Sequence, residues 1–372
     1  MLSAEDNLRL NVLLAQNMQA VRIDESKMIV YALTDKGEAR VQLNANCNDE
    51  RYIKEVKSLF STHVMGSPGG YPVFLNRWAR MGQARDESLE QLLLLGEPEA
   101  VVAAVHAKGL TDELAEKAWW AMPTAENARR MLEKEAVVKG RTGPVLAEFL
   151  IEFLPFEENP HVMIESVRLV LQPGLISEDD KHKLWSKAKS KRNLYVGFLH
   201  ALPEDLPEAA QPHPLFADVL PKLKSFESLN NPYALLLHRV LCGSGQRFLQ
   251  VSELALNKPG NQEVVESLLD AIAAYFSDIR PDAFIADDIE AICQHAETCC
   301  CQTDNDDDMR EILEAVPELK AEIQAMLVLS CLGVELINPI FAKTDAIGTM
   351  MRKKIKPISD KILVQLYTLM HK

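Results

Sequence analysis

The residues best suited to carry out chemistry lie near position 300. Cys293 and His295 precede three consecutive cysteines, Cys299, Cys300 and Cys301. On a helix, His295 and Cys299 share one face because they are four residues apart. Cys293 and Cys300 share another face. Converging thiolates bind soft metals or relay sulfur, and three adjacent cysteines at a fraying helix end are able to converge.

The same cysteines also have a purely structural interpretation, which we favour. Their spacing matches neither paired CxxC units nor a zinc ribbon. Free cysteines pack as small hydrophobic residues, and the isolated Cys47, Cys242 and Cys331 are expected to do so. No metal and no other cofactor is therefore predicted.

The remaining polar motifs do not predict catalysis. Asp304–Asp308 resembles the opening of a calcium loop, but Met309 stands where the loop needs glycine and Ala315 where it needs a bidentate glutamate. A solvated acidic loop leading into a helix N-terminus is expected instead. The chain has no phosphate-binding loop, dinucleotide fingerprint or nucleophile elbow. No catalytic residue is nominated, and a non-enzymatic protein is predicted.

Two further groups are candidates for partner binding. Trp119, Trp120 and Trp185 are aromatic residues of the kind that mark interfaces, although packing between helix pairs explains them better. The other group is the basic end of the chain. Its members are Arg352, Lys353, Lys354 and Lys356. They could contact an acidic partner or RNA, but a terminal capping helix with a polar outer face is the preferred interpretation.

Charge constrains the partners. The net charge of −14 divides into +5 from residue 352 onward, where six basic residues face one acid, and −19 before it. A phosphate backbone would be repelled by most of this surface, so nucleic-acid binding is not expected.

The N-terminus lacks signal-peptide features. The longest apolar stretch, Ala325–Val334, is half the ~20 residues that span a bilayer. Seven cysteines without scaffold spacing fit a reducing compartment, so a cytoplasmic location without membrane insertion is predicted.

The elements that position these residues are mostly helices. Gly109-Leu110 and Trp120 recur 65 residues later as Gly174-Leu175 and Trp185. Such an echo predicts stacked helical repeats in which the two indoles occupy equivalent positions. Stripes at i, i+4 predict buried helix faces. One such helix contains Val145, Leu146, Phe149, Leu150 and Phe153.

The predicted fold is mainly α, an α-solenoid of HEAT-like repeats preceded by a small α+β domain. The domains are expected at 1–70, 73–202 and 222–372, with an extended proline-rich crossover from Pro203 to Pro221. Short runs rich in Val, Ile and Tyr predict an antiparallel sheet of three strands, covered by a helix. These elements are Val21–Asp24, Met28–Leu33, Ala39–Leu43 and the helix Asp49–Thr62.

Three stretches resemble a known family. They are Arg77–Gln83, Ser88–Val102 and Ala118–Leu132. They resemble the DsrS family, soluble proteins encoded with the dissimilatory sulfite reductase (Dsr) proteins of sulfur-oxidising bacteria. The resemblance implies a cytoplasmic accessory protein connected with oxidation of stored sulfur. It supplies no catalytic residues. It suggests a role for Cys299–Cys301 in sulfur transfer, since that pathway passes sulfur between thiols as persulfides.

Three functions follow as hypotheses. The first is a helical-repeat protein that binds a protein of a sulfur-oxidation system or regulates its production. The second is a thiol or metal protein that carries sulfur or a soft metal through Cys299–Cys301. The third is an RNA-binding regulator acting through the basic end. No small-molecule substrate is identified.

Overall fold

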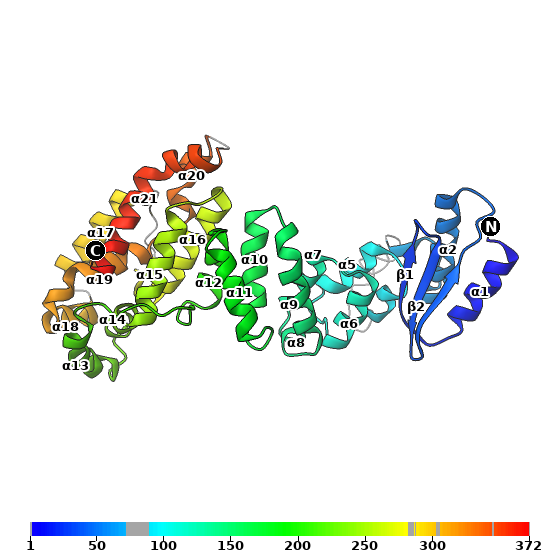
Figure 1. Ribbon diagram of the computed structural model, residues 1–372, viewed down its shortest axis with the longest axis horizontal. Helices are drawn as coiled ribbons and strands as arrows, with labels where there is room; N and C mark the ends of the chain where they lie inside the picture. The colour runs from blue at the N-terminus through cyan, green and yellow to red at the C-terminus, as the bar shows by residue number, and fades with distance from the viewer. Residues whose placement is uncertain are drawn as a thin grey trace. The chain divides into compact units, whose positions relative to one another are not determined.

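The computed structural model describes residues 2–71, 89–281, 286, 288–302, 306–343 and 346–371. The described chain is mainly helical and carries a small antiparallel sheet near its N-terminus (Figure 1). None of its helices is both long and apolar enough to cross a bilayer. The chain forms two compact units.

The first unit comprises Met1–Phe153 and Gln172–Ile176. It therefore joins the predicted α+β domain to the first helices that follow it. Its elements are α1 (Ala4–Leu14), β1 (Met18–Asp24), β2 (Ile29–Thr34), β3 (Gly37–Gln42), α2 (Asp49–Met65), α4 (Leu89–Leu93), α5 (Pro98–His106), α6 (Asp112–Ala121), α7 (Ala125–Leu132), α8 (Glu135–Val138) and α9 (Thr142–Phe153).

The second unit comprises Leu154–Leu171 and Ser177–Lys372. All regular elements among its described residues are helices. They are α10 (Pro160–Val170), α11 (Glu178–Ala188), α12 (Asn193–Ala201), α13 (Phe216–Glu227), α14 (Pro232–Leu241), α15 (Gly243–Leu256), α16 (Gln262–Tyr275), α17 (Ile289–Cys301), α18 (Asp307–Ala315), α19 (Lys320–Ser330), α20 (Asn338–Phe341) and α21 (Gly348–Met370), with short 3₁₀ turns between some of them.

The sheet is an antiparallel meander in the order β1-β2-β3, as the sequence predicts. Arg22 pairs with Tyr31, and Val21 pairs with Ala32. Because side chains alternate along a strand, Arg22 and Tyr31 lie on the face opposite to Val21. One face of the sheet is therefore apolar, and the other carries a cation and an aromatic ring.

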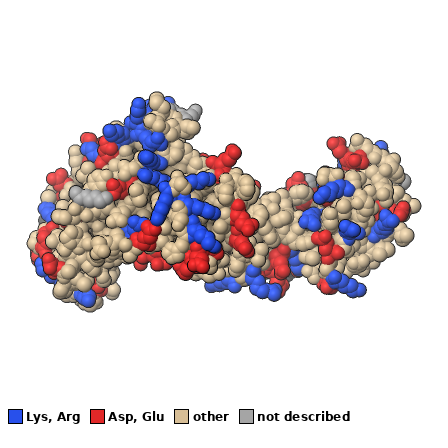
Figure 2. Space-filling model, viewed as in Figure 1, with Lys and Arg blue, Asp and Glu red and all other residues tan. Residues whose placement is uncertain are grey.

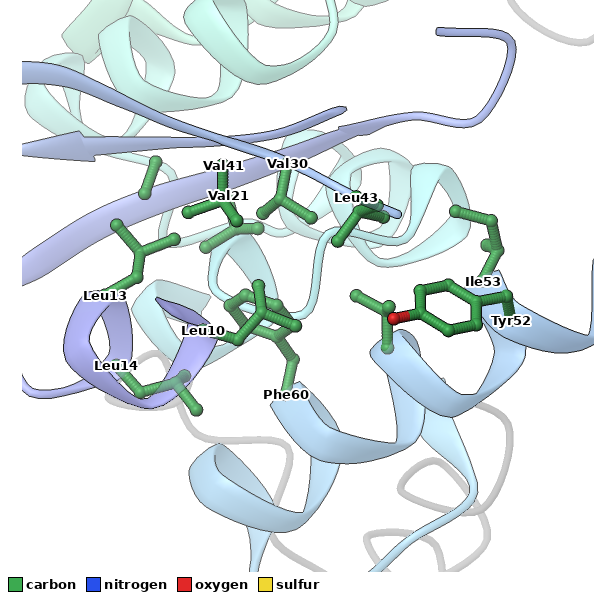
Figure 3. Close-up of a cluster of buried hydrophobic side chains, with 12 residues drawn as sticks. Leu10, Leu13, Leu14, Val21, Val30, Val41, Leu43, Tyr52, Ile53 and Phe60 are labelled. Atoms are coloured by element: carbon green, nitrogen blue, oxygen red, sulfur yellow. The ribbon is translucent and has the colours of Figure 1, made fainter. Parts of the chain in front are cut away.

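The apolar face is covered by α1 and α2 (Figure 3). Leu10 from α1, Val30 from the sheet and Phe60 from α2 are fully buried. One polar pair crosses this core, in which the Tyr52 hydroxyl donates to a carboxylate oxygen of Asp6 at 2.5 Å. Burial and this bond raise the pKa of Tyr52, so the tyrosine stays protonated.

The proline-rich crossover is shorter than predicted. The chain is irregular after Leu202, but α13 begins at Phe216, and Pro221 lies inside that helix. A proline in a helix removes one hydrogen bond, and here the remaining bonds of the helix persist on both sides. The prediction of an extended segment as far as Pro221 is wrong because proline lacks a backbone N–H donor but does not by itself end a helix.

Candidate functional site

A groove in the first unit joins several of the features singled out in the sequence. It is a cleft of about 420 Å³ between α6 and α9. Most of its walls are apolar. The lining residues are Glu116, Trp119, Trp120, Pro123, Arg141, Thr142 and Val145. We call this cleft the aromatic groove.

The polar face of the sheet holds Trp120 in place. The Trp120 indole N–H donates to Glu38 Oε2 at 3.1 Å, and Glu38 pairs with Arg22 at 3.3 Å. The guanidinium of Arg22 lies 5.0 Å from the Trp120 ring centroid and 4.6 Å from that of Tyr31. Such stacking of a cation on rings is attractive. Trp120 is therefore half-buried and fixed before any partner arrives, which lowers the entropic cost of binding.

A row of apolar side chains on α9 extends the aromatic groove. Val145 is 50% exposed and Phe153 is 37% exposed. Phe149 lies between them, stacked on Phe153 with ring centroids 5.9 Å apart and in edge contact with Trp119 at 4.8 Å. The three residues are four apart, so they form one line along the helix. We call Val145, Phe149 and Phe153 the α9 stripe.

This stripe is the second apolar face of its helix. Leu146, Ala147 and Leu150 are buried on the other side of α9. A surface helix of a globular protein normally has a single apolar face, directed at the core. The sequence predicted one buried face here, whereas the structure separates the residues into a buried row and a second row that is exposed at both ends and half-buried at Phe149. An exposed row of this kind is typical of a binding surface.

The N-terminus of α9 is fixed by Asp112 at the start of α6. Its carboxylate accepts hydrogen bonds from the backbone N–H groups of Arg141 at 2.9 Å and Thr142 at 3.0 Å. Burial pushes the pKa of Asp112 upward, but hydrogen bonding by the Thr142 side chain and by the backbone of Arg141 and Thr142 outweighs it, so the pKa lies below its ordinary value. A Cβ at Gly140 would meet the carboxylate carbon at 2.1 Å, so glycine is needed there. The two walls of the groove are thus tied together at one end.

Trp185 does not occupy an equivalent position to Trp120. It is 1% exposed and lies in edge contact with Tyr195 at 4.8 Å and Phe198 at 4.9 Å. The expectation of equivalent indoles is wrong, because the two turns differ in length. Thr111 caps α6 nine residues before Trp120, but Ser177 caps α11 only eight residues before Trp185.

One residue corresponds to about 100° of rotation around a helix. Counted from the caps, the counterpart of Trp185 is Trp119, which also makes an edge contact with a phenylalanine of a later helix. Trp120 is the additional aromatic residue, and it is the one that the sheet holds in the groove.

The cysteine cluster does not converge. All three consecutive cysteines belong to α17, where neighbouring side chains diverge by about 100°. Cys300 is 4% exposed and sealed in the core, while Cys301 is exposed with its Sγ 3.8 Å from Lys320 Nζ. Within the described residues no group of three or more His, Cys, Asp and Glu side chains is placed to hold a metal ion.

Cys299 lines a cleft. This cleft, of about 570 Å³, also contains His295, Tyr233, Arg280 and Asp306. Cys299 Sγ lies 3.6 Å from His295 Nε2, and the Tyr233 hydroxyl donates to Asp306 at 2.7 Å. Burial raises the pKa of Cys299, with further contributions from Cys331 and Asp306, so the thiol form is favoured.

The other expected polar features have structural roles. Asp306 caps α18 by accepting from the Met309 N–H at 2.9 Å, as expected of an acidic loop before a helix, while residues 303–305 lie outside the described part. Cys293 is half-buried one to two turns before the consecutive cysteines, and burial raises its pKa. Of these residues, Asp306 also lines the Cys299 cleft, whereas Cys293 is not among the residues that line it.

The basic end forms one face of α21. Arg352 is half-buried and donates to the Pro259 carbonyl at 3.2 Å, whereas Lys353, Lys354 and Lys356 are exposed. Figure 2 shows basic side chains gathered over the region where α21 begins. The opposite face of α21 buries apolar residues such as Ile355. The helix α21 therefore has one basic, exposed face and one apolar, buried face.

A histidine site was missed by the sequence reasoning. His161 and His200 line a cleft of about 380 Å³ together with Asp270. His200 Nε2 lies 2.8 Å from the Ser267 carbonyl oxygen, and burial lowers the pKa of His200 and raises that of Asp270. These residues come from three helices, so their proximity had no signal in the sequence.

No family model, curated protein or solved structure matches this chain. Residues 77–83, which carry part of the resemblance to the DsrS family, lie outside the described residues. The stretch 118–132, which carries another part, contains Trp119, Trp120 and Pro123 of the aromatic groove.

Proposed function

We propose that this chain is a non-enzymatic protein that binds a protein partner through the aromatic groove. The observation that carries the proposal is the apolar row on α9, exposed at Val145 and Phe153 and half-buried at Phe149, beside an indole that the sheet holds in place. Aromatic residues are enriched at protein interfaces, and rigid ones bind with little loss of entropy. An apolar row that faces solvent has no role in the core of the first unit.

The fold that we propose for the helical part is an α-solenoid of HEAT-like repeats. In its support, helices such as α10 to α12 are 9–11 residues long and are joined by short turns. Helix pairs of this length stack into superhelices whose extended surfaces bind other proteins.

We further propose that the protein works in the cytoplasm as an accessory of bacterial sulfur oxidation. This part of the proposal is supported by the resemblance to the DsrS family. One of the stretches that carry the resemblance, residues 118–132, contains Trp119, Trp120 and Pro123 of the aromatic groove, so we propose the groove as the surface that a Dsr-system partner contacts.

A capture experiment tests the proposal. The immobilised full chain is exposed to extract of a sulfur-oxidising bacterium, alongside Val145→Glu and Leu8→Glu variants. Both residues are exposed apolar residues of the first unit, and Leu8, on α1, is 67% exposed. We expect one specific partner to be retained by the wild type and by Leu8→Glu and lost from Val145→Glu. Absence of a specific partner, or equal retention by both variants, contradicts the proposal.

A second candidate function is favoured by one observation, the pairing of Cys299 and His295 in an open cleft. We infer that a thiol or metal function, if present, involves Cys299 with His295 and excludes the sealed Cys300. Elemental analysis and persulfide mass spectrometry of protein purified under reducing conditions test it. Clean thiols with no bound metal would end this candidate.

A further inference from the structure

The charges around the aromatic groove have one predominant sign. On α9, Glu148 follows Val145 by three residues, and Glu152 follows Phe149 by three. On α6, Glu113 and Glu116 precede Trp120 by seven and four residues, so they share its face of the helix. All four glutamates are exposed, and none forms an ion pair within the described part of the chain.

The basic residues near the groove do not cancel this charge. Arg141 lines the cleft, and Lys117 on α6 lies 3.8 Å from Glu90. Arg22 is already stacked between Trp120 and Tyr31. Among the described residues, these four glutamates outnumber Arg141 at the rim, so this part of the groove is acidic around an apolar floor.

The shape of the apolar floor favours a helix as its occupant. The α9 stripe extends over nine residues, a rise of about 12 Å or roughly two helical turns. A partner helix covers such a line by packing a row of its own i, i+4 side chains against it. The hollow between Trp119, Trp120 and Val145 then receives one apolar side chain of the partner.

We propose that the partner binds as an amphipathic helix with an apolar face flanked by lysine and arginine. This inference rests on the proposed function and adds the chemistry of the partner to it. The apolar face of the partner helix packs on the α9 stripe, and its basic residues pair with the glutamates on both walls. Charge pairs of this kind set specificity and association rate, and a basic side chain also stacks on the exposed part of an indole.

The experiment measures the binding of labelled designed peptides to the full chain by fluorescence anisotropy. One peptide is an amphipathic helix of leucine and lysine, a second replaces every lysine by glutamate, and a third scrambles the first so that it has no apolar face. The protein variants are Glu148→Lys with Glu152→Lys, and a control with the same change of charge, Glu311→Lys with Glu314→Lys, at exposed positions of α18 in the other unit. Circular dichroism verifies that both variants fold.

We expect the leucine–lysine peptide to bind and the other two to bind at least ~10-fold more weakly. The Glu148→Lys, Glu152→Lys variant should lose roughly tenfold in affinity for the leucine–lysine peptide and gain affinity for the leucine–glutamate peptide. The control variant should keep the wild-type preference.

Three results overturn the inference. If the α18 control lowers the affinity for the leucine–lysine peptide equally, the peptide responds only to the overall negative charge of the protein. If the scrambled peptide binds tightly, binding does not depend on an apolar helix face. If the capture experiment yields a partner lost from Val145→Glu while charge reversal on α9 changes nothing, the partner is not basic and the proposed function stands. If substitutions in the groove change neither partner capture nor peptide binding, both the proposed function and this inference are wrong.

Discussion

The same sequence pattern, a Gly-Leu turn followed by a helix with a tryptophan, leads to opposite burial of the tryptophan in the two units. Both α6 and α11 follow a Gly-Leu turn and carry a tryptophan 65 residues apart, yet Trp185 is sealed in its unit and Trp120 is held open at a groove. The cause is one additional residue between the second turn and its cap, which rotates the helix by about 100° relative to its counterpart. A sequence echo therefore reports a shared local structure, and the cap position decides which side chains reach the core.

The largest expected effect concerns Trp185. Trp185→Ala should lower the free energy of unfolding by about 3–5 kcal/mol, because it leaves a cavity between Tyr195 and Phe198. Trp120→Ala should cost clearly less, since its indole is half-buried, but should abolish partner capture. Urea denaturation measures both. Equal loss of unfolding free energy in the two variants would contradict the claim that Trp185 is a core residue and Trp120 a surface residue.

The second effect extends the contrast to consecutive residues of one helix. Burial raises the pKa of the Cys300 thiol to about 11 from its ordinary 9, with a contribution from Cys299, while Cys301 is exposed. At neutral pH, two pKa units correspond to about a hundredfold smaller thiolate fraction. Alkylation followed by peptide mass spectrometry should therefore label Cys301 first, Cys299 more slowly and Cys300 last. Similar rates for Cys300 and Cys301 would show that α17 frays and that the thiols converge.

The third effect concerns the link between the walls of the groove. Asp112→Ala should cost about 1 kcal/mol of stability, the usual value of a helix cap. Because the folded pKa of Asp112 is lowered, its stabilisation is complete above the ordinary carboxyl pKa and is lost as the pH falls through the folded pKa. Denaturation at a series of acidic pH values should show a smaller loss of stability for Asp112→Asn than for the wild type. The same slope in both proteins would contradict the assignment.

The smallest effect concerns the support of Trp120. Glu38→Gln keeps an acceptor for the indole but removes the charge that pairs with Arg22, so the cost should be only about 0.5 kcal/mol. Partner affinity should fall by more than this loss of stability explains, because the indole becomes less fixed. Measuring the free energy of unfolding and the partner affinity of the same variant separates the loss of stability from the loss of affinity. An unchanged affinity would mean that the sheet does not orient Trp120.

Local patterns predicted the local structure well. The alternation of apolar residues and the turn sequences between them placed β1, β2 and β3 within a few residues of their observed ends. The helix predicted at Asp49–Thr62 is observed as Asp49–Met65 and buries Ile53 and Val56. Patterns of this kind depend on near neighbours in the chain, so one sequence suffices to read them.

The groove could not be predicted in the same way. The α9 stripe has the same i, i+4 spacing as a buried row, and only the packing of the unit decides which row faces solvent. The support of Trp120 depends on Glu38, which is 82 residues away in the chain. Its indole contact has no signature in a single sequence. The shift of one residue at the Ser177 cap does have one, because the two caps, Thr111 and Ser177, can be counted from their Gly-Leu turns.

The most direct test of the account is a photo-crosslinking amino acid placed at Val145, compared with the same residue at Leu8 and at Leu235, an exposed leucine of α14. In extract of a sulfur-oxidising bacterium, the account predicts one discrete protein adduct from position 145 and none from the other two. An adduct formed equally from all three positions, or only from position 8 or 235, would contradict the claim that the aromatic groove binds the partner.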